Sequence, residues 1–509
     1  MTVALISETD QKMTKLSQTS SSSPVEDNKP LINDRLPVEL MTEIFRLYLK
    51  SCDLNWSEGH HDFSISQTPF FLTKICQRWR TIAVNDASLW RNINLCFRKN
   101  KYKAQMELLK GWIDSGRAKS CPLTLSVKEY PTDRSSWELK ELYNLISLPE
   151  YRKRWVSMDL FCSPICTLDR ILGEFPNLKN LKLLPSRTHR QSYPFILEIV
   201  APKIEDIEVH DSVRLVVQGI PFNRIPNTTI VNRCMEEVLK EFQEGEASSP
   251  ATTTSLQYCN YVDMACRYVA PPAPIPLPAL RLLRGEFLAM NASFCKQMLD
   301  HLRSPLLETL VLCFDKYDEP PWKSLEAFVD NNSGLICLRC FQLTTGVLDE
   351  HKLIRILEAM PQLGELFLEH LGNAGSASIS SKIMGRLSGL PEQRNNDGTA
   401  PLTCEQWIIL PRLSAFTYKG PTENITWSNI AGFLQARSSS YDYGTAGQDA
   451  KSFNLRSTQD LRHLRYFAFD SHCDIKSEGS DTGLKSLQEM HDNNIFLGLD
   501  IRRKGISAL

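Results

Sequence analysis

Cysteine pairs are the first residues in this sequence that could do chemistry, because two thiolates three positions apart can hold zinc or form a redox couple. Cys337 and Cys340 have this spacing, and Cys162 and Cys166 form a looser pair. No second Cys-x-x-Cys pair lies at zinc-finger distance from the first. Cys340 instead falls in a strand-like phrase, where cysteine serves as a small hydrophobe. We therefore expect no metal site and no cofactor at these cysteines.

Two further clusters are polar. His60-His61-Asp62 could begin a metal site, but it lies in a polar segment without a partner cluster. Arg98–Lys103 is a basic hexamer that could contact phosphate or act in nuclear targeting, and a solvated connection between domains is the favoured interpretation. The sequence contains no G-x-G-x-x-G, P-loop, G-x-S-x-G or H-E-x-x-H motif. We therefore expect a protein that is not an enzyme; the alternative is an enzyme whose site carries no recognisable motif.

The composition of the chain narrows its class. Its 509 residues include 58 Lys and Arg against 59 Asp and Glu, a formal net charge of −1, which argues against a nucleic-acid or anionic-membrane partner. Hydrophobic residues make up 42%, enough for a core, and no run of about 20 apolar residues predicts a membrane span. The start of the chain lacks a secretory signal, and an odd count of 15 cysteines is typical of reduced thiols. We expect a cytoplasmic or nuclear protein.

The N-terminal part predicts a tail followed by helices. Residues 1–33 are rich in Ser and charge, so we expect a flexible tail. Pro37 suits the first turn of a helix, and the apolar stripe that follows is wide enough to leave apolar surface on more than one side. A second helix is predicted to begin at Thr68-Pro69. The stripes comprise Leu40, Ile44, Leu47 and Tyr48, and then Leu72, Ile75, Cys76, Trp79 and Ile82.

One phrase recurs along the rest of the chain: an apolar residue, a second three positions later and a third two positions after that, often with a proline in front. The copies are Leu178, Leu181, Leu183; Ile204, Ile207, Val209; Leu307, Leu310, Leu312; and Leu363, Leu366, Leu368, with looser copies at Trp155, Met158, Leu160; Leu280, Leu283; Leu335, Leu338, Cys340; Leu413, Phe416, Tyr418; and Leu461, Leu464, Tyr466.

The spacing of the phrases identifies a repeat. Intervals of 26, 27, 28 and 28 residues fall in the period of leucine-rich repeats, roughly 20–29 residues. The gap of 76 from residue 204 to 280 corresponds to about three units. The gaps of 50 and 48 that follow residue 363 correspond to two units each, or to one with an insertion.

The physical basis of the repeat is strand alternation, which places the two closing apolar residues on one face, while the first lies at the corner before the strand. One unit cannot bury this face, and stacked units can. The alternative is an ordinary α/β domain with coincidental spacing. The Asn or Cys of regular repeats is absent, so we expect an irregular solenoid: a curved parallel sheet with outer helices. Insertions are predicted near 242–278, 372–403 and 437–452, and residues between the strand leucines are candidate binding positions: Lys182, Glu208, Val311 and Phe367.

The region 36–127 resembles the F-box family. Leu36-Pro37-x-Glu39-Leu40 with Ile44-Phe45 is similar to the opening of an F-box. Phe71-Leu72-x-x-Ile75-Cys76-x-Arg78-Trp79-Arg80-x-Ile82-Ala83 is similar to its centre, and Ser88-Leu89-Trp90 to its end. Leu108–Ile113 followed by Pro122–Val127 resembles the phrase that comes after the box in F-box-like proteins of mushroom-forming fungi. The resemblance implies an all-α F-box-like domain over 34–97 and a leucine-rich-repeat-like solenoid over 98–509.

The resemblance also implies a function. F-box proteins dock on a Skp-family adaptor and, through it, on cullin and RING subunits, while their repeats hold a target protein for ubiquitination. The chain would then be the substrate-recognition subunit of an SCF-type ubiquitin ligase with an unknown protein substrate. Carried over by position, the adaptor-binding residues would be Leu36, Pro37, Leu40, Ile44, Phe45, Leu72, Cys76, Trp79 and Trp90.

Two points stay open from the sequence. The alternative function is a repeat-based interaction scaffold with a vestigial F-box. The connection over Ser51–Gln67 is longer than in many F-boxes, and it could add contacts to an adaptor or hinder them.

Overall fold

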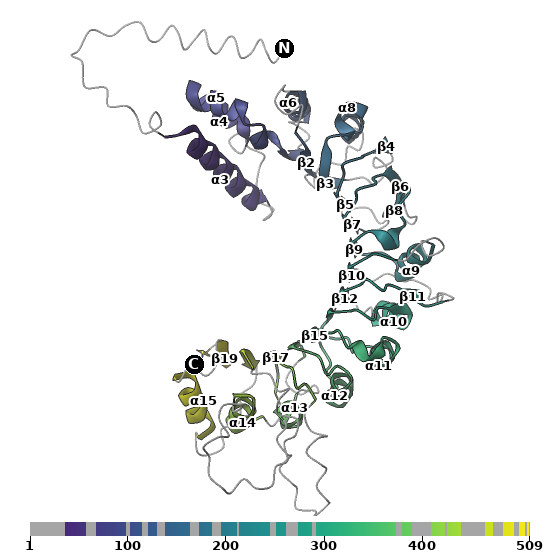
Figure 1. Cartoon of the computed structure of the whole chain (residues 1–509), viewed down its shortest axis with the longest axis vertical. Coiled ribbons are helices and arrows are strands. Elements are labelled where there is room, and N and C mark those ends of the chain that lie inside the picture. Colours follow the sequence, from purple (N-terminus) through teal and green to yellow (C-terminus); the bar gives the residue numbers. More distant parts are fainter. Residues whose placement is uncertain are drawn as a thin grey trace, which may run out of the picture. The chain divides into compact units, whose positions relative to one another are not determined.

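A computed structural model gives the architecture of the chain, which divides between Trp90 and Arg91 into two compact units (Figure 1). We call them the N-terminal unit and the C-terminal unit. The structure describes residues 36–56, 68–97, 102–114, 121–129, 138–162, 173–185, 195–210, 213–244, 251–260, 273–287, 292–372, 379–388, 409–422, 425–438, 464–471, 482–492, 498–503 and 506–507. The predicted tail over 1–33 lies outside the described residues.

The N-terminal unit is helical over its described residues. Its second predicted helix is broken at Cys76, whose backbone is extended (φ −156°, ψ 169°) and whose Sγ accepts a hydrogen bond from the Trp79 backbone N–H at 3.4 Å. Cys76 therefore ends one helix and caps the next. The elements are α3 (Val38–Trp56), α4 (Pro69–Ile75), α5 (Gln77–Asn85) and the 3₁₀ helix η2 (Ala87–Trp90).

Aromatic contacts organise the core of this unit. The ring centroids of Phe45 and Trp79 lie 4.7 Å apart, and Phe70 meets Trp90 edge-on at 4.9 Å. The buried indole of Trp90 donates a hydrogen bond to the Ala83 carbonyl at 2.7 Å, so its polar atom is satisfied. The buried apolar side chains among the described residues of the unit are Met41, Phe45, Pro69, Leu72, Ile82, Ala83, Leu89 and Trp90.

The C-terminal unit is built on one 15-stranded sheet, in which neighbouring strands are parallel until the last, antiparallel pair. In sheet order the strands are β1 (Asn92–Phe97), β2 (Leu123–Glu129), β3 (Trp155–Cys162), β5 (Asn180–Pro185), β7 (Asp206–His210), β9 (Asn227–Val231), β10 (Ser255–Asn260), β12 (Leu282–Phe287), β14 (Thr309–Phe314), β15 (Cys340–Thr345), β16 (Glu365–His370), β17 (Ala415–Gly420), β18 (Tyr466–Ser471), β19 (Gly498–Arg503) and β20 (Ile506–Ser507).

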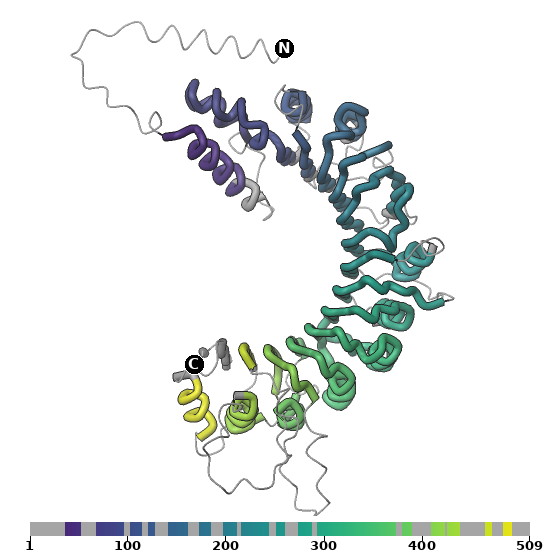
Figure 2. Tube along the Cα trace, viewed as in Figure 1, coloured from purple at the N-terminus to yellow at the C-terminus, as the bar shows by residue number. Residues whose placement is uncertain are grey.

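The segments that connect these strands lie on one side of the sheet (Figure 2). Between β5 and β9 the returning segments contain the strands β6 (Phe195–Val200) and β8 (Val213–Val217), which form a small sheet with β4 (Gly173–Glu174) in the order β4, β6, β8. A second small sheet pairs β11 (Ile275–Pro276) with β13 (Leu302–Arg303). The helical outer segments are α6 (Tyr102–Asp114), α7 (Glu138–Ile146), α8 (Pro149–Arg152), η6 (Phe222–Arg224), α9 (Met235–Glu244), α10 (Ala292–His301), α11 (Trp322–Asn331), η7 (Ser333–Leu335), α12 (Glu350–Glu358), α13 (Ser381–Ser388), α14 (Trp427–Ser438) and α15 (Thr482–Asp492).

The recurring apolar phrase forms the core between the sheet and its outer segments. Leu307 is buried at the corner before β14, and Leu310 and Leu312 are buried on the strand. The register continues these positions across the sheet, since Leu310 lies beside Leu283 on β12 and Leu312 beside Leu343 on β15. The predicted α/β class is therefore confirmed: the C-terminal unit is an irregular, leucine-rich-repeat-like solenoid with a long parallel sheet.

Two of the predicted phrases have the wrong register. We predicted Leu335, Leu338 and Cys340, but Leu310 pairs with Phe341, so the repeat reads Leu338, Phe341, Leu343 and Cys340 points to the other face. The predicted Leu461, Leu464, Tyr466 is likewise shifted by three residues, since Phe416 pairs with Phe467 and Tyr418 with Phe469. In both segments apolar residues recur so often that two phrases fit, and only the neighbouring strand decides between them.

The register also settles the irregular gaps. Strands β9 and β10 stand between β7 and β12, so the gap from Ile204 to Leu280 holds three steps as predicted. Strands β16, β17 and β18 are direct neighbours, so each of the two long gaps after Leu363 is one unit with an insertion. The segment 242–278 is not simply an insertion, because it contains β10, and 372–403 contains α13. Of 437–452, only 437–438 are described, at the end of α14.

Buried arginines supplement the apolar core. Arg233 forms hydrogen bonds from both terminal nitrogens to Glu241, at 2.9 and 2.8 Å. Arg437 on α14 donates to the carbonyl oxygens of Leu387 at 2.6 Å and Leu410 at 2.7 Å. Because Leu387 lies on α13, these contacts join two successive repeats of the solenoid. The contacts of Arg437 satisfy backbone groups at a helix end and a turn that would otherwise be buried without partners.

The corrected register predicts different costs for two neighbouring residues. Phe341→Ala removes a fully buried ring and should lower the free energy of unfolding by about 3–5 kcal/mol. Cys340→Ala alters a half-buried side chain on the opposite face and should lower it by less than about 1 kcal/mol. Denaturation of the two full-length variants, followed by circular dichroism, measures the difference. Equal losses would contradict the register.

Candidate functional site

The nine predicted adaptor-binding residues lie in the N-terminal unit but do not share one environment. Phe45, Leu72 and Trp90 are buried in the core of the unit, so they stabilise its fold and offer no surface to a partner. Leu36 and Trp79 are half-buried. The remaining four are exposed: Pro37, Leu40, Ile44 and Cys76.

An apolar face runs along α3 and continues onto α4. Leu40, Ile44 and Leu47 recur at four and three positions and therefore lie on one side of α3, where Ile44 is 45% and Leu47 58% exposed. Tyr48, one turn after Ile44, stacks on Phe71 of α4 with ring centroids 6.3 Å apart. Phe71 and Ile75, themselves one turn apart, are also exposed. We call this set the α3–α4 apolar face: Leu40, Ile44, Leu47, Tyr48, Phe71 and Ile75.

The sequence interpretation missed part of this face. The candidate residues did not include Leu47, Tyr48, Phe71 and Ile75, although all of these except Phe71 belong to the predicted stripes. The signal available in the sequence was the width of the first apolar stripe. A unit this small cannot bury so wide a stripe completely, so part of it had to remain exposed. The pair Phe71-Leu72 shows the limit of that signal, because the structure exposes the first and buries the second.

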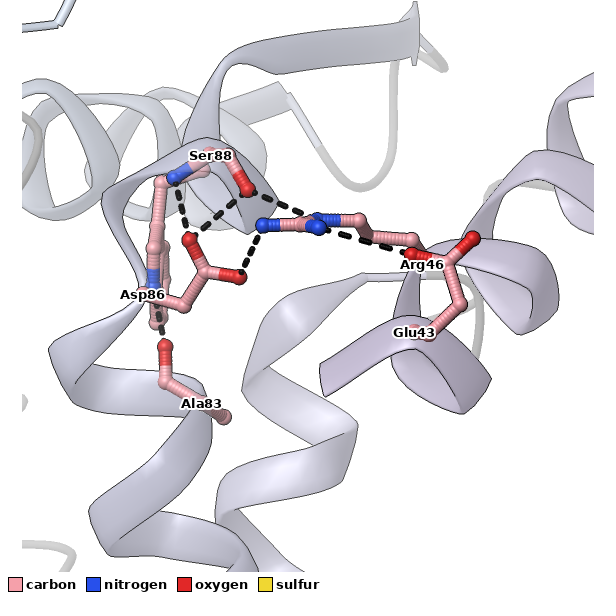
Figure 3. Close-up of polar contacts among 6 residues, drawn as sticks. Glu43, Arg46, Ala83, Asp86 and Ser88 are labelled. Atoms are coloured by element: carbon pink, nitrogen blue, oxygen red, sulfur yellow. Dashed lines mark hydrogen bonds and ion pairs between the residues drawn. The ribbon is translucent and has the colours of Figure 1, made fainter. Parts of the chain in front are cut away.

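Arg46 fixes α3 against the turn that ends the unit (Figure 3). Its Nη2 lies 3.2 Å from Asp86 Oδ2, its Nε donates to Ser88 Oγ at 3.1 Å, and its Nη1 lies 3.4 Å from Glu43 Oε2. Ser88 in turn donates from its hydroxyl to Asp86 Oδ1 at 2.7 Å. This network connects α3, the helix that carries the apolar face, to Asp86 and Ser88 at the end of the unit.

A second contact holds the entry to α3. The Arg78 guanidinium on α5 donates to the Leu36 carbonyl. Arg80 donates from Nε to the Thr73 carbonyl at 2.8 Å, across the break at Cys76. The arginines of the F-box-like centre thus bind backbone carbonyls of neighbouring segments. These contacts stabilise the fold of the unit, and this role alone accounts for the arginines.

The inner face of the sheet, opposite its outer segments, is the second candidate surface. Lys182 lies beside Glu208 in the register, and along the same row stand Thr229, Gln257, Arg284, Val311, Gln342 and Phe367. The candidates Lys182, Glu208, Val311 and Phe367 thus share one row, as the repeat pattern predicts. Apart from Val311, which is buried, these side chains are half-buried or exposed. The row is therefore a surface that a partner can contact.

Of the motifs with metal or redox spacing, Cys337 and Cys340 lie within the described residues. Within the described part of the chain no group of three or more His, Cys, Asp or Glu side chains could hold a metal ion. Burial, with the nearby Glu365 carboxylate, raises the pKa of the Cys340 thiol to about 11, which opposes the thiolate needed for metal binding. Cys162 lies on β3. Cys166, His60-His61-Asp62 and most of Arg98–Lys103 lie outside the described residues, as does most of the Ser51–Gln67 connection. No helix among the described residues is long and apolar enough to cross a membrane.

Comparisons with known proteins add little to this geometry. No family model matches the chain, and no curated protein matches it. Among solved structures, the chain is similar to the protein in the "Crystal structure of TLR13-ssRNA13 complex", with 12% sequence identity and a TM-score of 0.28. The match covers 75% of this chain and 51% of that one, so the chain spans about half the length of the solved protein. The fold assignment rests on the strands and register of this chain.

The division between core and surface predicts a large loss of hydrogen-exchange protection on substitution of one residue and a small change on substitution of its neighbour. Phe45→Ala should remove several kcal/mol of packing and lower the hydrogen-exchange protection of α3, α4 and α5 at least a hundredfold. Ile44→Ala, on the exposed face, should change it less than about threefold. Peptide-resolved hydrogen exchange of the full chain measures both. Protection lost equally in the two variants would show that Ile44 belongs to the core.

The raised pKa of Cys340 predicts slow alkylation. At pH 8 the thiol is almost entirely protonated, so iodoacetamide should label Cys340 far more slowly than an ordinary exposed cysteine, and the rate should keep rising as the pH increases through 11. Peptide mass spectrometry of the labelled chain measures the rate at each pH. Fast labelling at pH 8 would contradict the assigned burial and the effect of Glu365.

Proposed function

We propose that this chain is the substrate-recognition subunit of an SCF-type cullin–RING ubiquitin ligase. The observation that carries the proposal is the coincidence of two features: the F-box-like motif over 36–90 and the exposed α3–α4 apolar face, which includes Leu40 and Ile44 of that motif. Exposed apolar clusters of this kind mark protein interaction surfaces. The proposed occupant is a Skp-family adaptor, through which cullin and RING subunits would join.

The proposed role is non-catalytic. The N-terminal unit would contribute binding energy through the apolar area it buries, about 25 cal/mol per Å² before the costs of association. The C-terminal unit would hold a target protein, so that its lysines experience a high effective concentration of the ubiquitin-charged enzyme. The chain itself would supply no reacting group, and it would work in the cytoplasm or the nucleus, where these ligases act.

A specific observation favours a second candidate, an interaction scaffold with a vestigial F-box. Phe45, Leu72 and Trp90 are landmarks of the motif, and all three are buried in the core of the N-terminal unit. The arginines of the motif bind backbone carbonyls within the same unit. A chain that had lost its adaptor would keep these residues for folding. The exposed positions therefore decide between the two candidates.

Co-purification with a Skp-family adaptor tests the proposal. The wild-type chain, co-expressed with the adaptor, should retain it through affinity purification. Ile44→Glu places a charge in the middle of the apolar face and should lower the amount of retained adaptor at least tenfold. The matched control is Leu306→Glu in the C-terminal unit, where the leucine is 48% exposed, close to the 45% of Ile44. The control should retain the adaptor as the wild type does.

One result would overturn the ligase role, and another would overturn the assignment of the adaptor contact to the α3–α4 apolar face. The first is a wild-type chain that never retains the adaptor while an established F-box protein does under the same conditions, which leaves the scaffold. The second is equal retention by Ile44→Glu and the wild type, which would place the adaptor contact elsewhere. Hydrogen exchange of α3–α5 in the variant verifies that the unit is folded.

A further inference from the structure

A repeated β-turn forms the rim at which many strands of the long sheet begin. In each such turn the N–H of the fourth residue donates to the carbonyl of the first, as from Leu307 to Ser304 at 3.2 Å and from Leu338 to Leu335 at 2.8 Å. Proline suits the second position because its φ is already fixed near the value that the turn requires. Six turns have it there: Pro176, Pro202, Pro278, Pro305, Pro361 and Pro411. The second and third residues of these turns are half-buried or exposed, so they make up the surface of the rim.

Two successive turns of the rim expose large apolar side chains. Leu306 is the third residue of the turn before β14 and is 48% exposed. Ile336 takes the place of proline in the turn before β15 and is 58% exposed. Because β14 and β15 are neighbours in the sheet, the two side chains lie on adjacent turns, and we call them the apolar pair. Adjoining apolar side chains at this exposure indicate a contact surface for another molecule.

A strained backbone and a buried asparagine hold the apolar pair in place. Ser333, Gly334 and Leu335 have φ values of 58°, 69° and 45°, in the left-handed region, which is unfavourable for serine and leucine. Asn332, just before them, is buried, and its Oδ1 accepts a hydrogen bond from the backbone N–H of Ser304 at the start of the neighbouring turn. The two turns are therefore tied to each other, and a constrained backbone lowers the entropy cost of binding a partner there.

Cations continue the same rim beyond the apolar pair. Arg339, Arg412 and Arg465 precede β15, β17 and β18. Within the described part of the chain, none of these three guanidinium groups forms an ion pair. The carboxylate that follows in this row, Glu365, is hydrogen-bonded to the Cys340 thiol. The rim from β15 to β18 therefore carries more positive than negative charge.

The spacing of the arginines fits separate anionic groups. Arginines that hold one phosphate converge on it, whereas Arg339 and Arg465 are three strand steps of about 4.8 Å apart, roughly 14 Å. The small residues Gly364 and Ser414 stand between them, and the N–H groups of Arg465 and Ser414 donate to the carbonyls of Ser414 and Gly364, both at 2.7 Å. From Leu306 to Arg465 the rim spans four steps, roughly 19 Å, which an extended chain covers in about six residues at roughly 3.3 Å each.

From this arrangement we propose that the rim binds an extended acidic segment of a partner protein, in which apolar residues at one end are followed by spaced carboxylates. The apolar end covers Leu306 and Ile336, and the carboxylates pair with the arginines. Because the rim borders the inner face of the sheet, a target held by it can contact both surfaces. The inference deepens the proposed function by naming the class of target, and it rests on that proposal for what happens to the bound protein.

Peptide binding to the full chain tests the inference. The probe is a fluorescein-labelled peptide of two leucines followed by three glutamates that alternate with serines, and its reversed sequence is a second probe, both measured by fluorescence anisotropy at low salt. One of them should bind at least tenfold more tightly than its versions with serine for leucine or glutamine for glutamate, because each version lacks one kind of contact. Equal affinities, or no binding of either probe, would overturn the proposal. Tighter binding of a labelled oligouridylate would identify a nucleic acid as the occupant and would also overturn it.

A first matched pair of variants tests the apolar pair. Ile336→Asp places a negative charge beside Leu306 and should weaken binding of the better probe at least tenfold. The control is Tyr317→Asp, just after β14 at the other end of the strand, where the ring is 63% exposed. The control should leave the affinity unchanged. Equal weakening in both would show general repulsion of the probe and contradict the assigned site.

A second matched pair tests the cations. Arg339→Gln with Arg465→Gln should weaken binding about tenfold. The control, Lys296→Gln on α10 with Lys323→Gln on α11, removes the same charge from exposed positions on outer helices and should leave the affinity unchanged. Equal losses in the two double variants would show nonspecific attraction and overturn the proposal.

Charge reversal gives a result that misfolding cannot imitate. Arg339→Glu with Arg465→Glu should bind a peptide in which lysines replace the glutamates of the probe, a peptide that the wild type should not bind. Failure of this variant to bind the basic peptide, with the fold verified by circular dichroism, counts against the proposal.

Two further measurements separate this proposal from its neighbours. In analytical ultracentrifugation the wild-type chain should be a monomer, and a dimer that Ile336→Asp dissociates would identify a second copy as the occupant and overturn the proposal. Leu306→Glu, the control of the adaptor experiment, should weaken binding of the probe and still retain the adaptor. A failure of the rim site is thereby distinguished from a failure of the ligase role.

Discussion

The fold of the C-terminal unit depends on strand alternation within a continuous parallel ladder. Strands of five to eight residues have side chains on both faces, and the face toward the outer segments is the one that forms the continuous buried core. Leu283, for example, contributes to a core that is complete only when β10 and β14 stand on either side of it. No single repeat buries enough apolar area to offset the conformational entropy that its residues lose on folding, so the repeats are stable only as an array.

This constraint applies to the sheet and leaves the outer side free to vary. The step between equivalent core positions is short from Ile207 to Thr228 and more than twice as long from Leu366 to Phe416, and yet both pairs are direct neighbours in the sheet. Between β7 and β9 the chain returns as a strand, and along most of the sheet it returns as a helix. The inner face therefore keeps a regular grid of side-chain positions even though the repeat is irregular in length. A regular grid allows charges that are far apart in sequence to act as one surface.

The sequence allowed prediction of the repeated core because leucines at fixed offsets are rare by chance and have one simple physical cause. It could not place the register at Leu335–Cys340 or Leu461–Tyr466, where apolar residues occur at both possible positions and only pairing with β14 or β17 distinguishes them. In the N-terminal unit the helical spacing over α3 was predicted correctly, but periodicity alone could not separate buried Phe45 from exposed Ile44. That separation depends on where Trp79 lies after the break at Cys76, which is a tertiary contact.

The two candidate surfaces differ in the kind of selectivity they can provide. The α3–α4 apolar face would bind through apolar burial, which has little directional preference and suits a constant partner. The inner face of the sheet carries charged side chains, among them Lys182, Glu208 and Arg284. Burying these groups under a partner costs free energy, and the cost is recovered only when the partner brings groups that pair with them. A receptor subunit requires both kinds of surface. One binds an adaptor that is the same in every complex, and the other selects among target proteins.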